Sequence, residues 1–186
     1  MLVRMNAVNL VRRLHQHRDW VNENLLAAAS ALSDEQLRRP FQIGQGSIWS
    51  SLLHLYAAEF VWLEAVLGNE NALVQGDLPG RIPGNQMGEC RIASLEELRQ
   101  KWSDLQVRWQ EYLAGLSNES LDTPVFRFSA FLGQRLATRC SDVLLHVCTH
   151  AHYTTAQVVN MLRQVGVEKL PETMLISLAR KEANSP

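Results

Sequence analysis

Four long segments repeat apolar side chains at helical spacing, and this repetition limits the possible folds more than any other feature of the sequence. The first segment covers residues 5–31 and the second 48–67. The third follows Ser94 as far as Leu116, and the fourth covers 141–165. Side chains three and four residues apart share a face of a helix, so each segment can bury an apolar stripe. Helices of this kind favour an all-α bundle.

Local signals mark the ends of these helices. Ser94 is followed at the third position by Glu97, which is a capping box, and Gly68 and Gly166 come where helices stop. Pro171 can begin a short extra C-terminal helix over residues 171–183. Residues 125–138 alternate around a glycine and predict a small hairpin or an irregular insertion. Residues 69–93 contain four glycines and two prolines, so we expect a long, mobile connection.

Length and charge bound the class of protein. The 186 residues fit one domain, 1–186, and the 46% apolar and 20% charged content is ordinary for a globular chain. The net charge of −1 is spread without a basic face, so nucleic acid is not an expected partner. No run of 18 apolar residues suggests a membrane helix, and three unpaired cysteines favour a reducing cytoplasm.

The fourth segment carries a run of histidines, HVCTHAHYTTAQ, at residues 146–157. At about 100° per residue, positions four apart share a face, so His146 and His150 are neighbours. Thr154 and Gln157 continue that face, Tyr153 borders it, and His152 points elsewhere. Two neutral imidazoles at this spacing can offer nitrogens to one metal ion.

A third nitrogen could come from His54, in the middle of the second segment. Its helix face carries small residues, which would let a neighbouring helix approach and leave a cavity. Three histidines with one open position suit Lewis-acid or water-activating chemistry. The alternative is that His54 is a core histidine hydrogen-bonded to a carbonyl or carboxylate. We expect His15 and His17 on the surface of the first helix.

Two segments carry a resemblance to a known family. GSIWSSLLHLYAAEFVWLEAVLG and SDVLLHVCTHAHYTTAQVVNMLRQVG resemble the DinB/YfiT-like superfamily, the second through a family pattern of the form HxxNHxxxHRGQ. The order of elements agrees along nearly the whole chain. The resemblance implies an up-down-down-up four-helix bundle, often a homodimer. It also implies a three-histidine site for a divalent metal such as zinc, nickel or manganese.

The family pattern places its ligand from the second helix on His54 and its first ligand from the fourth helix on His150. The last ligand falls on Thr154, whose hydroxyl is a poor ligand for zinc or nickel. Either His146 takes its place, or the centre is lost and the face is a polar pocket. Gln157 keeps its place in the pattern.

Two functions from different classes follow. In the first, the chain is a metal-dependent enzyme of the hydrolase or thiol-dependent transferase type, acting on a small molecule with a low-molecular-weight thiol as a possible cosubstrate. Tyr153, Thr154 and Gln157 would line its pocket. In the second, it is a metal-free member that binds a small ligand or serves as a dimerisation module. The resemblance does not assign a catalytic residue.

Overall fold

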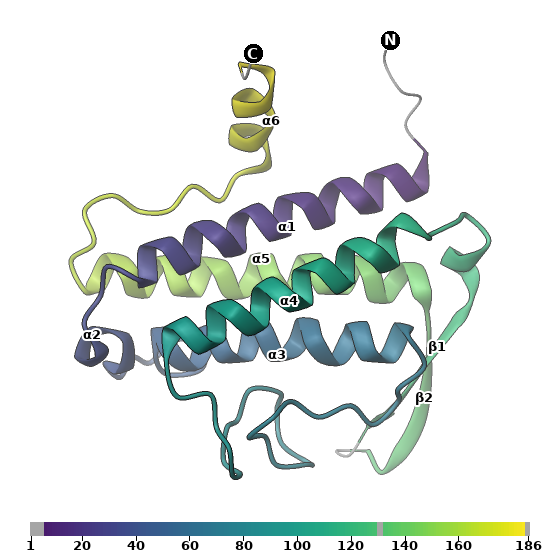
Figure 1. Ribbon diagram of the computed structural model, residues 1–186, viewed down its shortest axis with the longest axis horizontal. Helices are drawn as coiled ribbons and strands as arrows, with labels where there is room; N and C mark the ends of the chain where they lie inside the picture. The colour runs from purple at the N-terminus through teal and green to yellow at the C-terminus, as the bar shows by residue number, and fades with distance from the viewer. Residues whose placement is uncertain (1–5, 130–131, 185–186) are drawn as a thin grey trace.

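The computed structural model describes residues 6–129 and 132–184. Its body consists of four long helices that lie along one another in Figure 1: α1 (Ala7–Ala29), α3 (Ile48–Val66), α4 (Leu95–Ala114) and α5 (Cys140–Gln164). The expected helical bundle is therefore confirmed, with a small sheet in addition. Met5, expected in the first helix, and residues 130–131 of the expected hairpin lie outside the described residues.

The shorter elements lie around the four long helices (Figure 1). They are α2 (Asp34–Arg38), a 3₁₀ turn η1 (Ser120–Asp122), strands β1 (Pro124–Ser129) and β2 (Gln134–Arg139), and α6 (Leu175–Ala183). The strands pair antiparallel with Val125 opposite Thr138, so the small hairpin predicted from the alternating pattern is confirmed. It leads directly into α5 (Figure 1).

Serine side chains cap the starts of two long helices, one of them at the predicted Ser94. The Ser47 hydroxyl accepts a hydrogen bond from the Ser50 amide, and the Ser94 hydroxyl accepts one from the Glu97 amide. The Glu97 carboxylate in turn accepts from the Ala93 amide, 3.0 Å away. These bonds satisfy amides that have no partner within the helix, which is why the chain turns into a helix at each serine.

The core lies between the four long helices. Helix α3 is buried along most of its length, and Trp109 of α4 and Leu144 of α5 are fully buried against the same core. Each large apolar side chain removed from water stabilises the fold by roughly 1.5–3 kcal/mol. Packing, more than helix propensity, therefore holds α3 in place, and this rigid helix carries His54.

The start of the last helix differs from expectation. Helix α6 begins at Leu175, four residues after the predicted start at Pro171. The intervening residues are held extended against α1, because His17 bonds the Thr173 carbonyl at 2.8 Å and the Asn24 amide donates to the Glu172 carbonyl at 2.9 Å. These tertiary bonds compete with the local helical signal and prevail over it.

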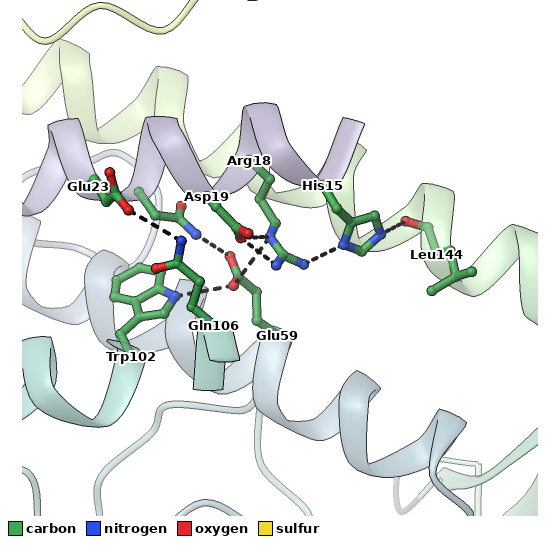
Figure 2. A network of polar contacts seen from close by, with 9 residues as sticks. His15, Arg18, Asp19, Glu23, Glu59, Trp102, Gln106 and Leu144 are labelled. Atoms are coloured by element: carbon green, nitrogen blue, oxygen red, sulfur yellow. Dashed lines mark hydrogen bonds and ion pairs between the residues drawn. The ribbon is translucent and has the colours of Figure 1, made fainter. Parts of the chain in front are cut away.

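The expectation of a surface position for His15 is wrong, since the side chain is fully buried, while His17 is only partly exposed. Nδ1 of His15 accepts from the Arg18 guanidinium at 2.8 Å, and its Nε2 donates to the Leu144 carbonyl at 3.2 Å. Arg18 also contacts Asp19 at 2.6 Å and Glu59 at 3.5 Å. Figure 2 shows this buried network crossing from α1 to α3 and α4.

The connection between α3 and α4 contains no helix or strand but is tied together by polar bonds. Asp77 is buried, and its carboxylate accepts from the Gly84 amide at 2.6 Å and from the amide and side chain of Gln86, both at 2.9 Å. This loop therefore has a defined shape, which matters for the site below. None of the described helices is long and apolar enough to cross a membrane.

Candidate metal centre

The structure brings two of the sequence-predicted ligands together. His54 from the middle of α3 and His150 from the middle of α5 approach with their Nε2 atoms 3.1 Å apart. Their rings stand nearly perpendicular, at 73°, with centroids 5.0 Å apart. Both side chains are partly buried between the two helices. The helices pack directly against each other here, so the pair is fixed by the bundle itself.

The loop after α3 sets the tautomer of His54. Nδ1 of His54 lies 2.8 Å from the Pro83 carbonyl oxygen. A carbonyl can only accept, so Nδ1 carries the proton and the Nε2 lone pair of the neutral ring is free to face His150. A backbone or carboxylate acceptor on the far nitrogen is the usual companion of a metal-binding histidine.

Backbone packing holds that carbonyl over His54. Gly84 has φ +82°, and a Cβ built at this position would lie 2.6 Å from the His54 Cα, so only glycine fits. The Gly84 amide is held by Asp77, as described above. The loop therefore approaches the histidine as closely as backbone can. Sequence reasoning missed this contact, and the signal that could have revealed it was the glycine spacing around Pro83.

His146 and His150 of α5 resist protonation. Burial, with smaller contributions from His54 and His146, lowers the pKa of His150 to about 4. Burial and the positive charge of Arg127 lower the pKa of His146 below its ordinary value. Neutral imidazole is the form that binds metal. The electrostatics therefore keep nitrogen lone pairs available near pH 7.

The spacing of the pair suits a shared cation. Two nitrogens bound to one tetrahedral zinc at about 2.0–2.1 Å stand about 3.3 Å apart. The observed separation of 3.1 Å is close to this value. In a neutral pair without a cation, His150 instead donates its Nε2 proton to the lone pair of His54. The donor chemistry and the spacing thus fit a divalent metal ion at two of its positions.

The third predicted ligand, His146, lies beside His150 and against Trp62. The His146 ring lies 5.7 Å from the His150 ring by centroid and packs edge-on against Trp62 at 5.4 Å. Within residues 6–129 and 132–184, no group of three or more His, Cys, Asp or Glu side chains is placed to hold a metal ion. The three-histidine site built from His54, His146 and His150 therefore stays a prediction. Thr154, at the position of the last ligand in the family pattern, is buried, with 2% of its surface exposed.

The other predicted pocket residues lie in different surroundings. Tyr153 is 67% exposed, so its side chain points largely to solvent. Gln157 lies against the loop before α3, where a Cβ on Gly44 would come within 2.6 Å of its Oε1 and 3.2 Å of the Ser51 hydroxyl. Since Ser51 is three residues before His54, Gln157 reaches the same face of α3 as the histidine pair.

A cavity of about 480 Å³ borders His54. Its walls come from the start of α3 and from the 80–87 loop, and they include Ser50, Arg81 and Met87. The Arg127 guanidinium of β1 is a second charged group in this region. It stacks 5.0 Å over the Trp62 ring, which itself packs against His146. Space for a small molecule with cationic neighbours is therefore present next to the pair. No sequence pattern indicated that the hairpin brings Arg127 to this region.

Comparisons with known proteins extend this description. The sequence is 25% identical to Protein DinB of Bacillus subtilis (strain 168) over 162 residues, which cover 86% of this chain and 88% of that protein. Among solved structures, YfiT from Bacillus subtilis superposes with a TM-score of 0.62 and 16% identity. That match covers 84% of this chain and 87% of YfiT. YfiT is described as a probable metal-dependent hydrolase with an unusual four-helix bundle topology.

The family comparison gives the assignment. The sequence model of the DinB superfamily matches residues 17–158, a range that includes both α3 and the histidine-bearing part of α5. His54 and His150, which meet in the structure, both fall inside the matched range. The chain therefore belongs to the DinB superfamily.

Proposed function

We propose that this chain is a DinB-like metal-dependent enzyme, of the hydrolase or thiol-dependent transferase type, acting on a small molecule between α3 and α5. One observation carries the proposal: two histidine ring nitrogens from different helices converge to 3.1 Å. The description of YfiT as a probable metal-dependent hydrolase supports the same class of chemistry.

His54 and His150 would hold the ion, with His146 as the third ligand after a change of side-chain rotamer. A zinc, nickel or manganese ion supplies Lewis-acid activation of a bound water or thiol. The chain's own residues orient the ligand histidines and the substrate. The Pro83 carbonyl keeps the Nε2 lone pair of His54 exposed. Gln157 would orient a small-molecule substrate taken up in the cavity beside His54. Tyr153, which points largely to solvent, does not line that cavity.

The up-down-down-up order of the helices and a homodimeric state belong to the same proposal. The long 67–94 connection supports the order, because it lets α4 begin at the same end of the bundle as α3 (Figure 1). Helices α1 and α5 run the opposite way in that view. A homodimer is expected from the family resemblance.

A second candidate function rests on a specific observation. Thr154 occupies the position where the family pattern has its last histidine, and a hydroxyl is a poor ligand for such metals. The chain would then be a metal-free member whose pocket binds a small ligand, or whose bundle serves in dimerisation. In that case the His54–His150 contact is a hydrogen bond between neutral rings.

Elemental analysis of untagged protein separates the two functions. For the enzyme, we expect about one zinc, nickel or manganese per chain in the wild type and a loss of metal in His150→Ala. His152→Ala is the matched control on α5, because this exposed side chain lies on a different face. A wild type without metal, together with metal gained by Thr154→His, would support the second function. Metal retained in His150→Ala would contradict the ligand assignment.

Activity is then screened with small electrophiles in the presence and absence of a low-molecular-weight thiol. Thiol-dependent turnover that is lost in His150→Ala supports the transferase type, and thiol-independent hydrolysis that is lost in the same variant supports the hydrolase type. If turnover persists in His150→Ala, the reaction takes place elsewhere.

A further inference from the structure

The cavity beside His54 carries positive charge on its wall. Among the described residues that line it, Arg81 is the one permanently charged side chain, and no aspartate or glutamate is present. The rest of the wall is polar but uncharged, as at Asn85, or apolar, as at Ile82 and Met87. The volume of about 480 Å³ is within the range of small-molecule sites. The charge on the wall therefore favours a small anion.

The hydrogen-bond donors of Arg81 are unused. Within the described part of the chain, its guanidinium makes no hydrogen bond and no ion pair. Asp77 of the same loop is already engaged, because its carboxylate accepts from the Gly84 amide and from the amide and side chain of Gln86. Glu89 lines a neighbouring cavity instead. A guanidinium binds a carboxylate through two parallel N–H bonds, so the wall offers a donor set that the fold itself leaves open.

Backbone contacts hold this part of the loop beside the histidine. The Asn85 side-chain amide donates to the Ile82 carbonyl at 3.0 Å, and Ile82 is adjacent to Arg81 in the chain. Gly84 packs so closely against the His54 backbone that a side chain at position 84 would collide. The main chain at Arg81 is therefore fixed relative to His54, and a ligand has to order one side chain alone.

A second guanidinium lies on the other side of His54 along α3. The cavity borders Ser50, about one turn before His54, whereas Arg127 stacks over Trp62, about two turns after it. Arg127 is partly buried, yet it makes no ion pair with any described residue. Positive groups thus flank the histidine in both directions along the helix. Their combined field attracts an anion to this face and repels a cation.

We propose that the small molecule bound beside the histidine pair carries a carboxylate group, which Arg81 holds through paired hydrogen bonds. Its apolar part lies against Ile82 and Met87, and its reactive end faces His54. One guanidinium balances the single charge of a carboxylate, whereas a phosphate monoester brings close to two charges at pH 7. This substrate class rests on the proposed function, but the binding of the carboxylate itself needs no metal. Arg81 is thus a specificity-determining residue.

The test is an NMR titration of the purified full-length chain at low ionic strength with benzoate, and with benzamide as an uncharged ligand of the same shape. We expect benzoate to bind saturably and to shift the backbone amides of the 80–87 loop. It should bind about fivefold to tenfold more tightly than benzamide, as expected for a charged hydrogen bond at an exposed side chain. High salt should reduce the preference, because it screens an exposed ion pair. In Arg81→Gln the preference should fall below about twofold.

Arg91→Gln is the matched control. Arg91 is also exposed and makes no ion pair with the described residues, but it lines the neighbouring cavity. This variant loses the same charge and should keep the preference for benzoate. The proposal fails if wild type shows no preference, if Arg81→Gln keeps it, or if Arg91→Gln loses it equally. Tighter binding of phenyl phosphate than of benzoate would overturn the choice of a carboxylate.

Metal content separates this proposal from the proposed function. Arg81→Gln should contain as much metal as wild type, because Arg81 is not a ligand. If wild type holds no metal but prefers benzoate through Arg81, the carboxylate site stands and the metal-dependent enzyme fails. If wild type holds metal but binds benzoate and benzamide equally, the enzyme stands and the substrate class fails.

Discussion

Helix α3 contributes to two polar clusters that differ in how completely they are satisfied. Glu59 joins the buried network with Arg18, Asn22 and Trp102, where its two carboxylate oxygens both accept hydrogen bonds. His54, little more than one turn earlier, has one nitrogen held by Pro83 and the other facing only His150. The charged groups of the first cluster are all paired, whereas in the second cluster the His54 Nε2 lone pair is free to bind a ligand.

This difference separates a structural role from a functional one. Charges as deeply buried as Arg18 and Glu59 are tolerated only when every group is paired, and breaking the set leaves an uncompensated charge. The histidine pair is partly exposed, so the fold depends on it far less. Substitutions in the buried network should therefore lower the stability of the fold. Substitutions in the histidine pair should lower metal binding instead. The predictions below test this division, starting from the largest expected effect.

Replacing Glu59 should damage the fold most. Glu59→Leu leaves Arg18 with a single carboxylate partner and strands the donors of Asn22 and Trp102. We expect a loss of about 3–5 kcal/mol in the free energy of unfolding, measured by urea denaturation. The matched control is Glu64→Leu on the same helix, whose partner Arg108 is substantially exposed, with an expected loss of about 0–1 kcal/mol. Equal losses of unfolding free energy in the two variants would contradict the structural role given to the buried network.

Acid should weaken the network through His15. Burial and the charge of Arg18 lower the pKa of His15 well below its ordinary value of 6.5. Below pH 6.5 the unfolded chain therefore binds a proton that the folded chain refuses, so stability falls as the pH drops. The slope from this group is at most about 1.4 kcal/mol per pH unit.

The variant His15→Gln removes that contribution. Its curve of unfolding free energy against pH, measured by urea denaturation from pH 7 to pH 5, should be flatter than that of wild type, even though the variant is less stable at pH 7. The neighbouring carboxylates titrate in both proteins and cancel to first order. His152→Gln, at an exposed position, should run parallel to wild type. If unfolding free energy changes with pH as steeply in His15→Gln as in wild type, this pH dependence does not come from His15.

Asp77 links the loop to the pair, so its loss should affect both stability and metal binding. Asp77→Ala removes acceptors for the Gly84 and Gln86 amides. We expect a loss of about 1–3 kcal/mol in stability and, if the chain binds metal, a 10- to 100-fold weaker affinity because Pro83 no longer orients His54. Metal titration by calorimetry measures the second effect. Asp104→Ala, an exposed position on α4, should change neither quantity.

The smallest effect on stability is expected at His146. Its side chain is exposed, so His146→Ala should change the free energy of unfolding by less than about 0.5 kcal/mol. Metal content should nevertheless fall if this histidine completes the site. Unchanged metal content in His146→Ala would mean that water or another group supplies the third position, and the pair alone would define the centre.

Helical spacing predicted the bundle and the shared face of His146 and His150, whereas the pairing of His54 with His150 was expected from the family pattern. Helical spacing failed where tertiary contacts determine the position of a side chain. His15 looked like a surface residue, and only the Arg18 guanidinium and the Leu144 carbonyl explain its burial. Pro171 predicted the start of a helix, but hydrogen bonds from α1 hold the following residues extended. The contact of Pro83 with His54 links residues 29 positions apart, beyond the reach of periodicity.

The identity of that contact has a consequence for mutagenesis. The group that sets the His54 tautomer is a main-chain carbonyl, and every amino acid at position 83 would supply one. A scan of single substitutions would therefore score position 83 as replaceable even if its oxygen is indispensable. The sensitivity would appear instead at position 84, where any side chain would collide with α3. Replacing the amide bond before Gly84 by an ester would weaken this carbonyl as an acceptor and would also remove the Gly84 N–H that donates to Asp77, without changing a side chain.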